Sequence, residues 1–254
     1  MIIDTHAHYD DEQFDIDREE ILNSMQDSGI ELIVNVGADM KTSEQTLKLT
    51  EQFPFVYGAV GVHPSSTMEL DETKIERLKE LANMPKIVAI GEIGLDYYWD
   101  EPDRDTQKRW FDRQMELARE VKLPIIIHSR DAAKDTFDMM KAAHARDISG
   151  VIHCFSYSVD MAREYLNMGF YLGIGGVVTF KNARIIKEVV EYAPIDSIVL
   201  ETDCPYLAPE PNRGKRNSSL YLPNVVEEIA RIKGIETDEV IELTRKNATK
   251  LYRL

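Results

Sequence analysis

The sequence has little cysteine, no long apolar run and fewer basic than acidic residues. Two cysteines, Cys154 and Cys204, are too few for a disulfide framework, and we expect both to be small packing residues. No apolar run approaches the ~18 residues that a membrane-spanning helix needs. The start, Met1–Asp4, has neither a basic segment nor a signal-type apolar stretch. We therefore expect a soluble, cytoplasmic protein with no membrane partner.

The balance of charge restricts the class of partner. The chain has 30 basic and 45 acidic residues, which gives a formal net charge of −15. Such a field repels polyanions at long range and disfavours a protein that binds long duplexes through an extended basic surface. A substrate with one or two phosphates, held by a few cations or by metal ions, is compatible with this charge. Because 43% of the residues are hydrophobic, the chain can bury a core and is not disordered or collagen-like.

Short β-branched runs alternate with amphipathic stretches along the whole chain. Each interval has the length of one βα unit, and runs this apolar are typical of strands buried on both faces. The predicted strands are Ile2–Thr5, Leu32–Val36, Val56–Val62, Ile87–Ile90, Ile125–Ile127, Val151–Ile152, Tyr171–Ile174 and Ile198–Leu200. The predicted helices include Arg18–Ser28, Glu72–Ala82, Thr106–Val121, Ala132–Ala145, Val159–Met168 and a final helix over Asp238–Leu254.

Local signals mark several helix ends. Asp17 and Asp71 are predicted N-caps, and Glu20 completes a capping box with Asp17. Gly29 and Gly169 follow predicted helices at positions where a left-handed residue is favoured.

Eight strands that alternate with helices predict a (β/α)8 TIM barrel with an extra C-terminal helix, in a single domain over residues 1–254. The competing fold is an open doubly wound sheet, which normally begins with a glycine-rich phosphate-binding turn after its first strand. Residues 4–9 read Asp-Thr-His-Ala-His-Tyr and contain no glycine. The sequence therefore favours the barrel.

Five of the six histidines lie at or just after the end of a predicted strand, and only His144 is predicted inside a helix. The five are His6, His8, His63, His128 and His153. The carboxyl ends of barrel strands converge on the face where such enzymes keep their active sites. Random placement would scatter histidines over helices and loops, so this concentration indicates a functional site.

Carboxylates accompany these histidines. Asp4, His6 and His8 have the i, i+2 spacing that puts extended side chains on one face. Glu92 ends the fourth strand among glycines, and Asp203 follows the eighth. Each residue alone has an ordinary structural explanation, such as a core histidine or a salt-bridge partner. Four imidazoles and two carboxylates together exceed the needs of one four-coordinate ion and suit two ions that share a carboxylate.

Six motifs occur in order across essentially the whole chain. They are Asp4-Thr5-His6-Ala7-His8, Gly61-Val62-His63-Pro64, Gly91-Glu92-Ile93-Gly94-Leu95-Asp96, Ile127-His128-Ser129-Arg130, His153-Cys154-Phe155 and Glu201-Thr202-Asp203-Cys204-Pro205-Tyr206-Leu207. This set resembles the TatD-type metal-dependent deoxyribonucleases, which belong to the amidohydrolase-like barrels. The resemblance implies a (β/α)8 barrel, two divalent metal ions per chain and hydrolysis of phosphodiester bonds, typically in DNA.

The resemblance also implies roles for individual residues. One ion would be held by His6, His8, Glu92 and Asp203, and the second by Glu92, His128 and His153. Glu92 would act in catalysis by bridging the ions, and Asp203 as a ligand, as a proton acceptor for the attacking water, or as both. The metal is Mg²⁺, Mn²⁺ or Zn²⁺, because imidazoles suit Zn²⁺ or Mn²⁺ whereas Mg²⁺ prefers oxygen ligands.

Several residues are expected to contact the substrate. They are His63, Arg130, Lys215 and Arg216, although solvated surface is an equal explanation for the basic residues. The aromatic residues at 97–99 would either stack on a base or pin their loop to the barrel. Members of the family usually carry Asn-Glu-Pro after a basic run, and this chain has Asn217-Ser218-Ser219. The departure bears on the substrate range.

We therefore expect a 3′–5′ exodeoxyribonuclease that uses a two-metal-activated water on DNA ends or short oligonucleotides. The alternative is a metal-dependent hydrolase of ester or C–N bonds, for example in aminoacylated RNA. Many C–N hydrolases bridge their metals with a carboxylated lysine, and no lysine lies between Lys86 and Lys108. A non-catalytic binding protein is disfavoured because all six expected ligands are present. The sequence does not indicate an oligomeric state.

Overall fold

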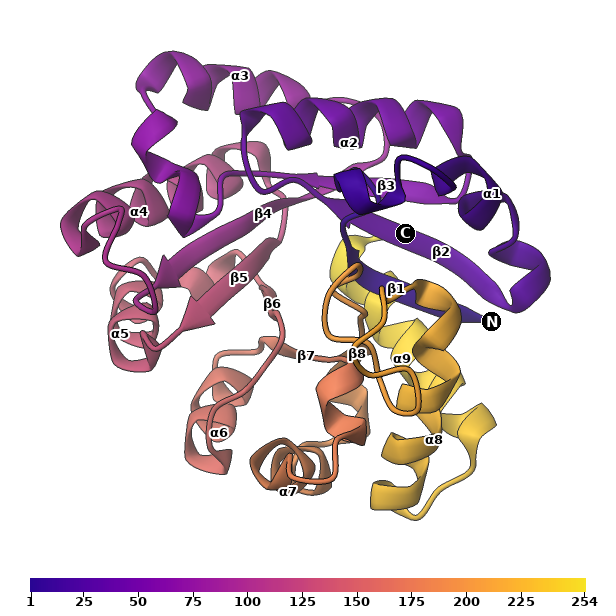
Figure 1. Ribbon diagram of the computed structural model, residues 1–254. Helices are drawn as coiled ribbons and strands as arrows, with labels where there is room; N and C mark the ends of the chain where they lie inside the picture. The colour runs from indigo at the N-terminus through magenta and orange to yellow at the C-terminus, as the bar shows by residue number, and fades with distance from the viewer. The chain divides into compact units, whose positions relative to one another are not determined.

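The computed structural model describes all residues from 1 to 254 and contains one parallel sheet with its eight strands in chain order (Figure 1). The strands are β1 (Ile2–Ala7), β2 (Ile30–Val36), β3 (Val56–Val60), β4 (Ile87–Asp96), β5 (Ile125–Arg130), β6 (Gly150–Ile152), β7 (Tyr171–Ile174) and β8 (Ile198–Leu200). The α-helices are α1 (Arg18–Asn23), α2 (Met40–Gln52), α3 (Glu72–Ala82), α4 (Arg104–Val121), α5 (Ala133–Ala142), α6 (Val159–Asn167), α7 (Arg184–Tyr192), α8 (Leu222–Lys233) and α9 (Thr237–Tyr252). This alternation confirms the predicted (β/α)8 TIM-barrel fold with its additional C-terminal helix α9.

All eight predicted strands are present, and the largest differences lie at the carboxyl ends of two of them. β4 continues six residues beyond Ile90 to Asp96, and β5 continues three residues beyond Ile127 to Arg130. The predicted strands are too short because they cover only the apolar runs, and these extensions contain glycine, carboxylate, histidine and arginine. The polar residues of interest therefore belong to the strands themselves and not to the loops that follow.

Three of the predicted caps are confirmed. The Asp71 carboxylate accepts a hydrogen bond from Lys74 N at the start of α3. Gly29 and Gly169 adopt left-handed backbone conformations with φ of 85° and 83°. These residues end their segments in the way that the sequence predicted.

The capping box at Asp17 is wrong. Asp17 is the N-cap of α1 by position, but its side chain makes no capping hydrogen bond. The carboxylate instead binds the guanidinium of Arg216 at 2.5 and 2.8 Å. A bidentate pair with a charged guanidinium is stronger than one hydrogen bond from a neutral backbone N–H, so the long-range partner replaces the local one.

Two other helix predictions need correction. α1 ends at Asn23, and the rest of the predicted helix is a separate 3₁₀ turn over Gln26–Ser28. His144 lies outside α5, in a left-handed conformation at the start of the 3₁₀ turn Ala145–Asp147. The apolar spacing continued across both breaks, but the hydrogen-bonding pattern did not.

The chain divides into two compact units, of which the first comprises residues 1–35, 154–167 and 171–254. Within it, β1 and β8 run side by side and are extended by a parallel bridge between Ala7 and Cys204. Helix α9 packs against both strands (Figure 1). Its Tyr252 hydroxyl donates to the carbonyl of Thr5, and its Asn247 amide donates to the carbonyl of Ile198. The C-terminal helix therefore supports β1, which carries His6, and β8, which precedes Asp203.

The second unit comprises residues 36–153 and 168–170 and contains β3 to β6. Two buried glutamines of α4 hold the ends of its strands. Gln114 donates to the carbonyl and accepts from the N–H of Val62, just before His63. Gln107 makes the same pair of bonds with the backbone of Asp96. Both glutamines thereby orient backbone next to residues that carry candidate chemistry.

Gly94 has a specific structural requirement. Its φ is 149°, and a Cβ atom there would lie 1.9 Å from the carbonyl oxygen of His128. Only glycine allows β4 and β5 to approach this closely at that level, which is next to the His128 side chain.

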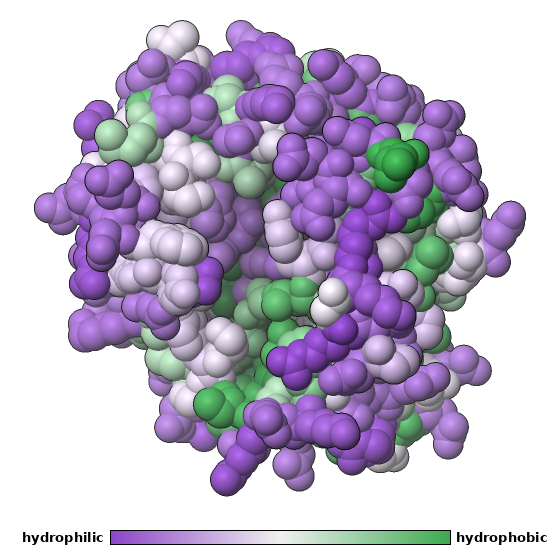
Figure 2. All heavy atoms as spheres, viewed as in Figure 1, coloured by the Kyte–Doolittle hydropathy of each residue, from purple (hydrophilic) through white to green (hydrophobic).

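Hydrophilic side chains cover most of the face shown in Figure 2, in keeping with a chain of which 30% is charged. None of the helices combines the length and the apolar character needed to cross a lipid bilayer. Both cysteines are free thiols, as expected. Cys204 is fully buried, and burial raises the pKa of its thiol, which agrees with a packing role.

Candidate functional site

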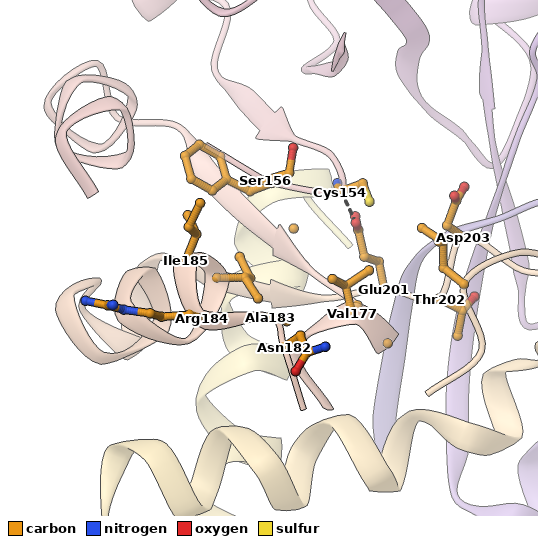
Figure 3. Close-up of a pocket in the computed structure, with 16 residues that line it drawn as sticks. Cys154, Ser156, Val177, Asn182, Ala183, Arg184, Ile185, Glu201, Thr202 and Asp203 are labelled. Carbon is orange, nitrogen blue, oxygen red and sulfur yellow. Dashed lines mark hydrogen bonds between the residues drawn. The ribbon is translucent and has the colours of Figure 1, made fainter. Parts of the chain in front are cut away.

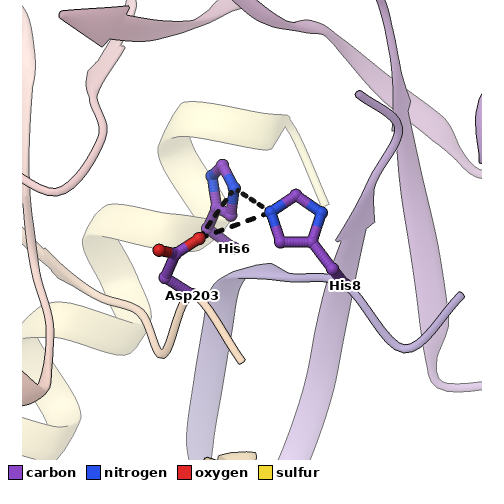
Figure 4. A group of neighbouring side chains, drawn as sticks. All are labelled: His6, His8 and Asp203. Atoms are coloured by element: carbon purple, nitrogen blue, oxygen red, sulfur yellow. Dashed lines mark hydrogen bonds and ion pairs between the residues drawn. The ribbon is translucent and has the colours of Figure 1, made fainter. Parts of the chain in front are cut away.

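In the first unit, His6, His8 and Asp203 form a compact group of potential metal ligands (Figure 4). The Nε2 atoms of the two histidines lie 3.0 Å apart. Asp203 Oδ1 lies 3.8 Å from His6 Nε2 and 3.3 Å from His8 Nε2. The His-x-His spacing therefore brings both imidazoles to one side, as predicted, and the residue after β8 adds a carboxylate.

The backbone fixes this group because the pairing of β1 and β8 continues past their ends. Asp203 N donates to His6 O at 2.9 Å, and His8 N donates to Cys204 O at 2.8 Å. Asp203 adopts a left-handed conformation with φ of 56°. The side chains are consequently positioned by main-chain hydrogen bonds and not by a flexible loop.

Asp4, two residues before His6 on β1, supports the same group. Its fully buried carboxylate accepts hydrogen bonds from Thr202 Oγ1 at 2.7 Å, Thr202 N at 3.1 Å and His6 N at 3.2 Å. Ser219 Oγ donates a fourth bond at 2.6 Å. Burial raises the pKa of Asp4 to about 7, although these hydrogen bonds favour its ionised form. Asp4 thus links the segments that carry His6 and Asp203.

The Asn-Ser-Ser departure from the family pattern lies inside this network. Ser219 is completely buried, and its hydroxyl lies 2.9 Å from the hydroxyl of Tyr9. Ser219 N donates to the same Tyr9 oxygen, and Ser218 Oγ lies 3.3 Å from it. The two serines therefore hold the loop after β8 against the first strand.

In the second unit, Glu92 is the centre of a second group of donors. Its Oε1 atom lies 2.7 Å from His128 Nδ1 and 3.7 Å from His153 Nε2. His63, Glu92 and His128 each offer a ligand atom within 4.8 Å of the others. His63 was expected to contact substrate, and the structure places it among these potential ligands, with its Nδ1 accepting from Ser65 N.

Asp96 was not among the predicted site residues, but its Oδ2 atom lies 3.1 Å from His128 Nε2. Burial opposes ionisation of Asp96, but hydrogen bonds from His128 and Tyr98 N lower its pKa. Burial likewise opposes the charged form of His128, and its bonds to Asp96 and Glu92 raise its pKa. The signal was available, because Glu92 and Asp96 are four residues apart and share a face of an extended strand.

Arg130, a predicted substrate contact, ends β5 with its guanidinium 3.8 Å from the ring centre of Tyr98. Tyr98 is itself exposed and meets Trp99 edge to face at 4.7 Å. Tyr97 donates from its hydroxyl to Asp135, which pins that residue to α5. The aromatic loop therefore both anchors itself and orients the arginine.

The predicted cations after β8 differ in their surroundings. Lys215 is exposed, whereas Arg216 is half-buried and pairs with Asp17 above the ring of Phe14. Arg213 stacks on Phe180 at 4.2 Å. The loop thus presents Lys215 to solvent and uses its arginines in intramolecular contacts.

The donors in both units fit divalent metal ions. Each unit brings together two imidazoles and one carboxylate, which is a ligand set suited to Zn²⁺ and to similar first-row ions. The buried supports of these donors, such as Asp4 and Asp96, resemble the outer partners that orient ligands in metal sites.

Comparison with known proteins gives a consistent assignment. The family model described as TatD related DNase matches residues 3–253. The chain is 45% identical over 254 residues to the uncharacterized metal-dependent hydrolase YabD of Bacillus subtilis, with 100% of both chains covered. It is 32% identical over 257 residues to the uncharacterized metal-dependent hydrolase YcfH of Escherichia coli K12, covering 100% of this chain and 96% of that protein.

Comparison with solved structures supports the same family assignment. The crystal structure of YjjV, a TatD homolog from Escherichia coli K12, matches with a TM-score of 0.94 at 28% identity, covering 100% of this chain and 98% of the other. An uncharacterized amidohydrolase from Saccharomyces cerevisiae shares the fold with a TM-score of 0.84 at 18% identity, covering 99% of both chains. This chain therefore belongs to the TatD-related DNase family of metal-dependent hydrolases.

Proposed function

We propose that this protein hydrolyses phosphodiester bonds at the ends of DNA strands, in the 3′ to 5′ direction, with two divalent ions per chain. The observation that carries this proposal is the pair of histidine–carboxylate groups, one at the ends of β1 and β8 and one at the ends of β4 and β5. The match to the TatD related DNase family over residues 3–253 supports the same chemistry for these groups.

The proposed ligands follow the family resemblance. His6, His8, Glu92 and Asp203 would hold one ion, and Glu92, His128 and His153 the other. The 2.7 Å contact between Glu92 and His128 supports the second set. When bound, the divalent ions would supply Lewis-acid stabilisation of the phosphoryl oxygens and a lowered pKa for water.

Other side chains would accept the proton of the attacking water and bind the substrate phosphate. Asp203 is exposed enough to receive the proton of the attacking water, since 18% of its side chain is accessible, compared with 1% for His6. Arg130 is oriented by Tyr98 and would grip a substrate phosphate through two N–H groups. Lys215 would add a second, more flexible cation.

The preference for strand ends follows from charge. A net charge of −15 is unfavourable for binding many phosphates along a duplex. One or two phosphates near a strand end require only Arg130, Lys215 and the metal charge. We therefore expect shallow salt dependence and no stable complex with long duplex DNA.

The test compares a closed circular single strand with its linear form, using protein reloaded separately with Mg²⁺, Mn²⁺ or Zn²⁺. Labels at the 5′ or 3′ end report the direction. The expected result is stepwise loss from the 3′ end of the linear strand and an intact circle. Equal cleavage of both forms would identify an endonuclease. Cleavage of an aminoacyl ester, with no DNA cleavage under any metal, would replace the proposal with the ester hydrolase.

A further inference from the structure

A cavity of about 390 Å³ lies in the first unit directly beside Asp203 (Figure 3). Its walls come from the segment after β6, the segment between β7 and α7, the start of α7 and the residues after β8. This volume lies within the ~300–1,000 Å³ range of small-ligand pockets and is too small for a duplex. The cavity is therefore sized for one part of a substrate.

The lining is mostly apolar. Phe155 and Ile186 form buried walls, and Val177 and Ala183 are half-buried beside them. Ile185 lies at the rim, and 54% of it is exposed. Covering such an apolar surface with a ligand removes it from water, which makes binding more favourable.

The charged groups of the cavity exclude a phosphate as its occupant. Glu201 is buried, and its Oε1 atom accepts a hydrogen bond from Cys154 N at 2.6 Å. A Cβ atom at Gly173 would lie 2.2 Å from Glu201 Oε2, so the glycine makes room for the carboxylate. Arg184 is the one cationic lining residue, and its exposed guanidinium pairs with Glu188. The buried carboxylate of Glu201 would repel an anion inside the cavity.

Polar groups that suit a neutral ring are present at the rim. The side chains of Asn182 and Ser156 are exposed lining residues, and Figure 3 shows them on opposite sides of the cavity. An amide and a hydroxyl provide donors and acceptors for the edge of a heterocycle. A neutral, planar group with apolar faces and a polar edge matches all of these features.

We propose that this cavity binds a nucleobase of the substrate, namely one of the two bases that flank the phosphodiester bond cleaved beside Asp203. This inference rests on the proposed function. Apolar contact with the base would contribute to binding, and its edge would meet Asn182. One amide and one hydroxyl make few specific bonds, so we expect the cavity to accept all four bases.

The test uses two linear oligonucleotides, one normal and one that lacks both bases flanking the last 3′ phosphodiester bond. Since contact with a base is worth ~1–3 kcal/mol, the wild-type kcat/KM should be about five-fold to one-hundred-fold lower for the oligonucleotide without these bases. This comparison requires no mutation and therefore does not depend on the folding of a variant.

Ala183→Phe adds a ring that fills the cavity. We expect this variant to lose about ten-fold in kcat/KM on the normal oligonucleotide and to equal the wild type on the one without bases. Ala142→Phe is the matched control, because Ala142 is an exposed residue at the end of α5 and does not line the cavity. It should behave as the wild type on both substrates.

The possible outcomes separate the two proposals. Cleavage of both oligonucleotides by the wild type with equal kcat/KM would overturn the nucleobase site and leave the nuclease function intact. Cleavage of neither, under any of the three metals, would overturn the proposed function and this inference with it. A loss on both substrates for Ala183→Phe alone would also count against the nucleobase site, because the added ring would then act without regard to the base.

Discussion

Ser219 donates a hydrogen bond of 2.6 Å to the buried carboxylate of Asp4, although the two residues are 215 positions apart in the chain. Through this bond the loop after β8 is joined to the first strand. The Asp4 carboxylate also accepts hydrogen bonds from Thr202, the neighbour of Asp203, and from the backbone N–H of His6. Asp203 and His6 are both potential metal ligands. The order of the first donor group therefore depends on a serine that belongs to neither strand.

Ser219→Ala should destabilise the protein. The substitution removes a donor to a carboxylate that has no access to water, and such a loss costs about 1–3 kcal/mol of the free energy of unfolding. Denaturation of the metal-free protein by urea measures this difference. Ser28→Ala, at an exposed serine, should stay within about 0.5 kcal/mol of the wild type. Equal values for the two variants would show that the bond to Asp4 contributes nothing.

Glu228 should make stability depend on pH. Hydrogen bonds from Arg231 lower its pKa to about 2, against the opposing effect of burial, and Lys187 of α7 adds to the shift. Because the folded-state pKa is depressed, the stabilisation is complete above the unfolded value of 4.5 and is lost as the pH falls toward 2. Since Arg231 is largely exposed, we expect only about 1 kcal/mol.

The measurement for Glu228 is the difference in free energy of unfolding between the wild type and Glu228→Gln. The difference should be present at neutral pH and disappear between pH 4.5 and pH 2. Glu227→Gln is the control, because Glu227 is the exposed neighbour on the same helix. A difference for Glu228→Gln that persists to the lowest pH would refute an ionic origin.

Glu92→Ala should abolish hydrolysis and reduce the bound metal to fewer than two ions per chain. The reason is that Glu92 contacts His128 and lies near His153, so it would be shared among the ligands of the second unit. Metal analysis of the purified variant together with an oligonucleotide assay tests both effects. Two retained ions with near-normal turnover would rule out the bridging role.

Asp203→Asn should separate metal binding from proton transfer. The variant keeps the volume and one oxygen but loses the negative charge and the ability to accept a proton. We expect metal content close to that of the wild type and a fall in kcat of ~10²–10⁴, the range for a lost general base. Activity within a few fold of the wild type would limit Asp203 to ligation.

Local patterns in the sequence determined the βα alternation, the C-terminal helix and the histidines at the strand ends. Period-2 and period-3.6 spacings depend on neighbouring residues, so a single chain reveals them. The His-x-His pair is an example, because the pleat of one strand suffices to place His6 and His8 on the same side.

The tertiary structure decided the partners of polar groups that lie far apart in the chain. Asp17 exchanged a local cap for Arg216, 199 residues away, and Ser219 met Asp4 across 215 residues. Gln114 found the backbone of Val62 in the same way. A buried polar group must be hydrogen-bonded, but many distant residues offer suitable atoms, and only the packed fold brings one of them within reach.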